Sequence, residues 1–100
     1  GEANRSDLIA TDIEVRQGNV AVTYSVSDRG RVSDLEVVEF SPEDFPDMLR
    51  DVQRQVRARL YRPRFRDGEP VDTTDQLFTH EFYYRVSELE ERRAAQANND

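Results

Sequence analysis

Apolar and small polar residues alternate from residue 20 onward, which is typical of a β-strand. Val and Tyr occupy the even positions of the stretch 20–26, with Ala, Thr and Ser between them. A period of two with β-branched residues predicts a half-buried strand. Asp28 and Gly30 then favour a tight turn in which the glycine takes a positive φ. Residues 31–40 predict the returning strand of a hairpin, with a β-bulge near Ser33-Asp34 where the alternation slips.

A helical pattern follows the strand-stopping motif Ser41-Pro42-Glu43-Asp44. We expect Asp44 or Phe45 to cap this helix and Pro46 to lie in its first turn, where a missing N–H costs nothing. Apolar residues recur in steps of three and four, at Phe45, Met48, Leu49, Val52, Val56 and Leu60. This spacing predicts one buried stripe on a helix that Pro63 ends.

The remaining segments are shorter or less regular. Residues 61–66 predict a short extended piece, Asp67-Gly68 a turn, and Pro70 keeps its neighbours off a central strand. Residues 75–86 predict the last strand, with apolar groups on both faces, which favours a covered second face or an interface. Ser87 can cap a short helix through residue 95. At the other end, Gln17-Gly18-Asn19 predicts a turn.

These elements predict a two-layer α+β domain. A three-stranded antiparallel sheet in β-β-α-β order packs on one helix, and an extra N-terminal helix or arm is left open. We expect residues 1–17 to form a loose N-terminal arm, residues 18–86 the folded domain, and residues 87–100 a charged tail with room for a short helix.

Composition limits the size and the partners of this domain. The chain has 100 residues, enough for one compact domain, and is 36% hydrophobic and 35% charged. Its formal net charge of -7 disfavours binding to nucleic acid or to an anionic membrane. The absence of cysteine excludes disulfides and cysteine-based metal sites. No apolar run approaches the ~20 residues of a membrane span.

Arginines collect between residues 50 and 66, where seven of them accompany the single acid Asp51. Arg50, Arg54 and Arg57 share one outer face of the predicted helix, which makes this face a candidate surface for an acidic partner or for nucleic acid, although no aromatic stacking motif accompanies it and the whole chain is acidic. The alternative is a solvated face that neutralises nearby acids. Stacking of Arg59 or Arg62 on Tyr61 is a further expectation.

Candidate catalytic and metal-binding groups do not assemble into a recognisable site. The only histidine, His80, lies within the last predicted strand, and no Gly-x-Ser-x-Gly motif accompanies it. Asp72 and Asp75 flank two threonines without a calcium-loop glycine. The four glycines are scattered and form no phosphate loop. The sequence therefore predicts a protein that is not an enzyme and needs no metal or cofactor.

A sheet of three strands cannot hide both of its edges, and an open edge can accept a strand from another protein. We therefore expect binding or dimerisation through an edge, and a homodimer is one outcome left open.

Several segments resemble the TonB C-terminal domain family in order and spacing. The segments are Gly18–Val26, Asp28–Val32, Leu35–Val38, Val52–Leu60, Tyr61–Val71, with its aromatic-x-Pro and Asp-Gly-x-Pro-Val motifs, and Phe82–Arg85. The resemblance covers residues 18–86. It implies a two-layer α+β fold and a periplasmic location, tethered to the inner membrane through a segment outside this sequence. It further implies energy transmission to outer-membrane TonB-dependent transporters.

The same resemblance implies that a transporter segment binds by strand addition to the last strand. Carried over by position, the pairing strand consists of Leu77, Phe78, Thr79, His80, Glu81, Phe82, Tyr83 and Tyr84. The family's Tyr-Pro in the arm is here Asp7-Leu8, and its aromatic before the helix-ending Tyr is Leu60. The alternative is a similar interaction module without energy coupling, in a periplasmic or lipid-anchored envelope protein.

Overall fold

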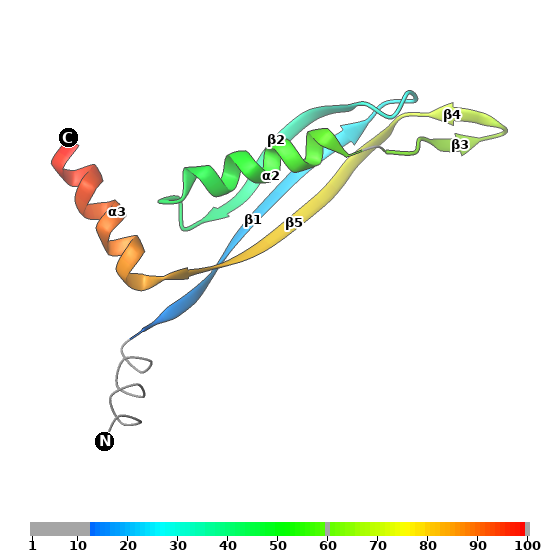
Figure 1. Cartoon of the computed structure of the whole chain (residues 1–100). Helices are drawn as coiled ribbons and strands as arrows, with labels where there is room; N and C mark the ends of the chain where they lie inside the picture. The colour runs from blue at the N-terminus through cyan, green and yellow to red at the C-terminus, as the bar shows by residue number, and fades with distance from the viewer. Residues whose placement is uncertain (1–12, 60, 100) are drawn as a thin grey trace, which may run out of the picture. The chain divides into compact units, whose positions relative to one another are not determined.

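The computed structural model describes residues 13–59 and 61–99, and it has the α+β fold that the sequence pattern predicts (Figure 1). The elements are β1 Val15–Val26, β2 Val32–Ser41, α2 Pro46–Ala58, β3 Arg64–Arg66, β4 Glu69–Val71, β5 Thr73–Arg85 and α3 Val86–Asn99. One sheet has the strand order β2-β1-β5, and β3 pairs with β4 in a separate two-stranded sheet. The expected three-stranded antiparallel sheet with a helix is confirmed.

The chain divides into two compact units. The larger is Asn19–Glu81, and the smaller contains residues 13–18 and 82–99 in its described part. The N-terminal helix or arm that the sequence left open falls mostly on residues 1–12, which lie outside the described residues. Residues 15–17 of that expected arm belong to β1 instead.

The β1–β2 hairpin has the predicted turn and the predicted bulge. Gly30 has a φ of 78° and donates its N–H to the Ser27 carbonyl at 2.9 Å. The register shifts between Thr23 and Ser25, and Asp34 on the opposite strand has a φ of 53°. An aspartate in the left-handed region is typical of a bulge residue, because its short side chain tolerates that conformation.

The core of the larger unit lies between the sheet and α2. Val20 and Val22 of β1 are fully buried, and so are Val52 and Val56 of the helical stripe. Phe45 occupies the N-cap and Pro46 the first helical position, as predicted. α2 packs against β2, as Figure 1 shows. Leu60, the last residue of the expected stripe, lies outside the described residues.

α2 ends at Ala58, where Arg59 takes an extended conformation with a ψ of 143°, so the helix stops before the expected Pro63. The Tyr61 hydroxyl donates a hydrogen bond to the Val56 carbonyl at 3.0 Å. The last four carbonyls of a helix lack a partner within the helix, so this side chain satisfies one of them.

The turn predicted at Gln17-Gly18-Asn19 is wrong, because these residues lie inside β1. Gly18 is buried against Phe82, and an added Cβ would lie 2.4 Å from the Cζ atom of that ring. The glycine therefore marks a close approach of an aromatic side chain to a strand, and not a chain reversal.

The Asp67-Gly68 turn is confirmed, and it connects two strands that pair with each other. Asp67 has a φ of 53° and Gly68 a φ of 83°, the two positive values that a type I′ hairpin turn needs. Phe65 lies opposite Pro70 in this β3–β4 hairpin.

The expected charged tail is largely helical, since α3 spans Val86–Asn99. Ser87 lies within the first turn, so the prediction that it caps the helix is wrong. The Val86 N–H instead donates to the Glu14 carbonyl at 3.0 Å, and Leu89 is buried. The Glu14 carbonyl thus satisfies one of the first four N–H groups of the helix, which have no acceptor within the helix.

The contact between Gly18 and Phe82 predicts the result of a single substitution. Gly18→Ala should lower the free energy of unfolding by about 1–3 kcal/mol, because the ring must move to admit the methyl group. Urea unfolding measures this change. In a Phe82→Leu background the same substitution should cost clearly less, and an unchanged midpoint for Gly18→Ala alone would contradict the close packing.

Candidate functional site

The two edges of the main sheet differ in charge, and the β2 edge is bulged. In the described residues β2 and β5 each pair on one side only. The β2 edge is interrupted by two register shifts and carries Asp34, Glu36 and Glu39, all exposed. Bulges and charges are devices by which proteins protect a sheet edge from another strand. The β2 edge is therefore poorly suited to strand addition.

The β5 edge lacks protective charges over five residues. Asp75, with a φ of 55°, interrupts the start of the strand, and Glu81 is the next charged residue. Residues 76–80 between them contain no acid, no arginine and no proline. We call residues 76–80 the β5 edge; they all lie in the larger unit.

The structure places the predicted pairing residues alternately on two faces of β5. Leu77, Thr79, Glu81 and Tyr83 are exposed, whereas Phe78, His80, Phe82 and Tyr84 are half-buried or buried. Leu77 is 62% exposed and Tyr83 71% exposed, so the second apolar face that the sequence predicts is open. Leu77–Glu81 belong to the larger unit and Phe82–Tyr84 to the smaller, so the predicted set of eight is divided.

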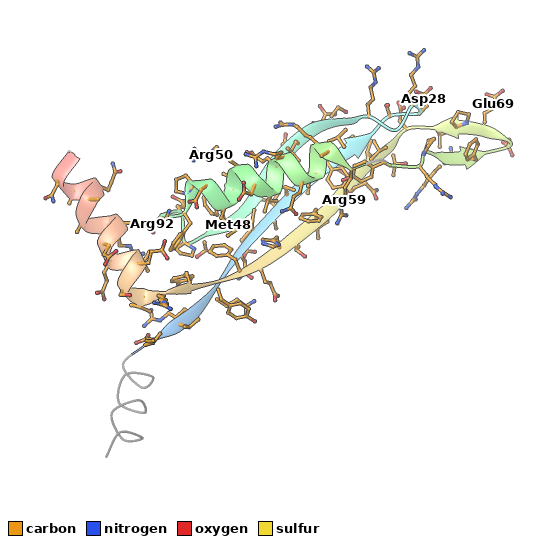
Figure 2. The ribbon with its side chains drawn as sticks, in the orientation of Figure 1. Asp28, Met48, Arg50, Arg59, Glu69 and Arg92 are labelled. Atoms are coloured by element: carbon orange, nitrogen blue, oxygen red, sulfur yellow. The ribbon has the colours of Figure 1, made fainter. Side chains whose placement is uncertain are left out.

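An arginine lies over the inner face of the β5 edge. The guanidinium carbon of Arg59 is 4.8 Å from the centroid of the Phe78 ring, within the range of a cation–π interaction. Figure 2 shows Arg59 where α2 ends. The sequence predicted stacking on Tyr61, but the tertiary fold places Phe78 under Arg59. The prediction paired neighbours in sequence, and it had no information on which strand passes beneath the helix end.

Arg50, Arg54 and Arg57 do come together, as the helical spacing predicts. All three are exposed, and with Gln53 and Ala58 they line an open hollow of about 470 Å³ on α2. Arg54 also pairs with Asp51, with 3.0 Å between Nη1 and Oδ1. We call Arg50, Arg54 and Arg57 the arginine face; Arg50 is labelled in Figure 2.

Two tyrosines connect the end of α2 to β1. The rings of Tyr24 and Tyr61 lie 5.4 Å apart at an angle of 51°. Burial, and after it the hydrogen bond and charge of Tyr24, together raise the pKa of Tyr61 to about 12, against a smaller opposite effect of Arg59. Tyr61 thus holds the segment that leads from the helix to the β3–β4 hairpin.

Asp72 has a structural contact that the sequence did not reveal. Its carboxylate accepts a hydrogen bond from the Asp28 N–H at 2.8 Å, which ties the β1–β2 turn to the start of β5. Asp75 instead lines an open hollow of about 410 Å³ with Asp34 and Glu36. Within residues 13–59 and 61–99, no group of three or more His, Cys, Asp or Glu is arranged to hold a metal ion.

The β3–β4 hairpin exposes an aromatic residue that the sequence analysis did not single out. Phe65 is 67% exposed and lies between Arg64 and Arg66, which are also exposed. The Asp67-Gly68 turn with an extended segment on each side indicates a hairpin in the sequence. The register of β3 with β4 decides which side chains of the hairpin are exposed.

No protein-family model matches the chain, and no curated protein sequence matches it. Among the described residues, no helix is both long and apolar enough to cross a membrane.

The raised pKa of Tyr61 predicts how stability changes at alkaline pH. Below about pH 10 the phenol is neutral in the folded and unfolded chains, so its contribution is complete. Between pH 10 and the folded value of about 12, only the unfolded chain ionises at this residue, so the free energy of unfolding should fall as pH rises.

Urea unfolding at about pH 9 and about pH 11 tests this expectation. Tyr61→Phe should reduce the difference in stability between the two pH values, because it removes the ionising group. Tyr83→Phe is the matched control, since Tyr83 is 71% exposed and should leave the difference unchanged. Equal effects of the two substitutions would argue against a special role of Tyr61.

Proposed function

We propose that this domain binds an extended segment of a partner protein by strand addition along the β5 edge, as the resemblance to TonB C-terminal domains implies. The observation that carries the proposal is the difference between the two sheet edges. β2 is bulged twice and acidic, whereas residues 76–80 of β5 carry neither charge nor proline. Binding, rather than catalysis, is therefore the function that we assign.

Strand addition explains why an edge can serve as a binding site without a deep pocket. Backbone N–H and C=O groups of the edge supply hydrogen bonds to any extended partner, and alternate side chains supply the specificity. On one face a partner strand would lie beside the exposed Leu77, and on the other beside Phe78, which Arg59 covers. The edge therefore offers an apolar side and a side with a fixed positive charge.

The resemblance supplies the biological setting of the proposal. An outer-membrane TonB-dependent transporter is the proposed partner, and transmission of inner-membrane energy in the periplasm is the proposed role. A second candidate is an envelope interaction module without energy coupling. It is favoured by Asp7-Leu8, which stand where the family usually has Tyr-Pro.

An amide NMR titration with a peptide copying a transporter's TonB-binding segment tests the proposal. Shifts should concentrate on residues 76–81 and saturate at micromolar to millimolar peptide, the range expected of a short strand addition. A scrambled peptide of the same composition is the control. No shifts with a well-dispersed spectrum would reject the transporter segment as partner and leave the second candidate.

Proline substitutions test the edge itself. Consecutive residues of a strand point their N–H groups to opposite sides, so only one of Thr79→Pro and His80→Pro removes a hydrogen bond to β1. The variant that keeps a dispersed spectrum should lose peptide binding at least tenfold. Val38→Pro, which lies in a β2 bulge without a partner residue on β1, should keep both the fold and the binding. Retained binding in the folded β5 variant would contradict strand addition there.

A further inference from the structure

The arginine face of α2 concentrates positive charge around a hollow that no part of the proposed strand addition uses. Arg50, Arg54 and Arg57 are exposed and, with Gln53 and Ala58, line about 470 Å³ of open space. Of these arginines only Arg54 forms an ion pair within the described ranges, with the exposed Asp51. The chain as a whole has a net charge of -7, so the arginine face is a positively charged region on an acidic protein.

Stabilisation of α2 does not explain the presence of all three arginines on this face. Arg57 lies in the last turn of α2, where a positive charge is favourable to the helix dipole. Arg50 is outside that turn, and it lies four residues before Arg54, a spacing at which like charges weaken a helix. Arg54 and Arg57 repeat the effect at a spacing of three residues. The Arg54–Asp51 pair and the place of Arg57 in the last turn offset part of this repulsion, and neither involves Arg50.

We propose that the arginine face is a second docking surface, which binds an acidic segment of a protein partner. Guanidinium groups bind carboxylates through paired hydrogen bonds, so the face and such a segment are complementary in charge and in hydrogen-bonding geometry. The surface is separate from the β5 edge, and it stands whether or not strand addition occurs.

The spacing of the arginines specifies the pattern of the acidic segment. Arg50 and Arg54 are about 6 Å apart along the helix axis, and Arg50 and Arg57 about 10.5 Å, at a rise of 1.5 Å per residue. Alternate residues of an extended chain lie about 6.5 Å apart on one side. Two acids at alternate positions of an extended segment therefore match the spacing of Arg50 and Arg54. About three such acids reach from Arg50 to Arg57.

An acidic protein segment fits better than nucleic acid does. A net charge of -7 repels the dense charge of a phosphate backbone over the rest of the surface, whereas a short peptide contacts only the arginine face. None of the residues that line the hollow is aromatic, so it has no platform on which a base can stack.

The test is an NMR titration of the full chain with the peptide Glu-Ser-Glu-Ser-Glu, read from the arginine Nε–Hε signals. Arg50, Arg54 and Arg57 should shift together, and rising salt should weaken binding, as for any exposed ion pair. The peptide Gln-Ser-Gln-Ser-Gln should cause no shift. The β5 proline variant that remains folded should bind the acidic peptide normally, which separates this surface from the strand edge.

A triple variant with a charge-matched control removes the effect of net charge. Arg50→Gln, Arg54→Gln and Arg57→Gln together should weaken acidic-peptide binding about tenfold, as expected when three exposed ion pairs are lost. Arg29→Gln, Arg31→Gln and Arg64→Gln remove the same charge from other exposed positions and should change binding less than about twofold.

Three results would overturn the proposal. Equal weakening in the two triple variants would show that only net charge matters. Unshifted signals of Arg50, Arg54 and Arg57 would place any binding elsewhere. Tighter binding of a single-stranded oligothymidine or of phosphatidylglycerol vesicles at the same salt concentration would replace the acidic protein segment by nucleic acid or membrane.

Discussion

The larger unit depends on the burial of one helical stripe against one face of a small sheet. Val20 and Val22 from β1 and Val52 and Val56 from α2 are its fully buried side chains, and each contributes roughly 1.5–3 kcal/mol when removed from water. A chain of 100 residues with 36% hydrophobic content has few other groups to bury. One helix therefore covers one face of the sheet. Within the described residues the outer edges of β2 and β5 have no neighbouring strand and are available for binding.

Each edge strand of the main sheet contains an aspartate with a positive φ, but the two edges differ in their suitability for strand addition. Asp34 and Asp75 both take a positive φ, one within β2 and one near the start of β5. In β2 the bulge adds to a second register shift and to neighbouring acids, which together discourage pairing. In β5 the positive φ of Asp75 lies before residue 76, and the five residues that follow carry no charge and no proline. The proposed strand addition rests on this difference, because exposed backbone groups alone do not distinguish the two edges.

The arginines divide between contacts inside the fold and contacts available to a partner. Arg59 covers the Phe78 ring at 4.8 Å and thus belongs to the packing of the β5 edge. The arginine face points away from that packing and lines an open hollow. If both proposals hold, a partner meets two distinct surfaces of the larger unit, one read through backbone hydrogen bonds and one through charge.

The local elements were determined by the sequence alone because their signals are short-range. Alternating Val and Tyr around residues 20–26, the three-four spacing that ends in Val56, and the Asp67-Gly68 turn each act through neighbouring residues, and the structure has all three. The arginine face was predictable for the same reason, since positions three and four apart share one side of any helix.

Tertiary structure decided the features that depend on residues far apart in the chain. The local sequence around Gly18 predicts a turn, but in the structure the Phe82 ring occupies the space that a side chain at this position would fill. Arg59 lies over the Phe78 ring, whereas the Tyr61 hydroxyl donates a hydrogen bond to the Val56 carbonyl near the end of α2. The strand order β2-β1-β5 leaves residues 76–80 at an open edge, and this order is known only from the pairing of the strands in the structure. Gly18 and Phe82, for example, lie 64 positions apart in the sequence. The pattern of neighbouring residues carries no information on which distant side chain will fill a given space.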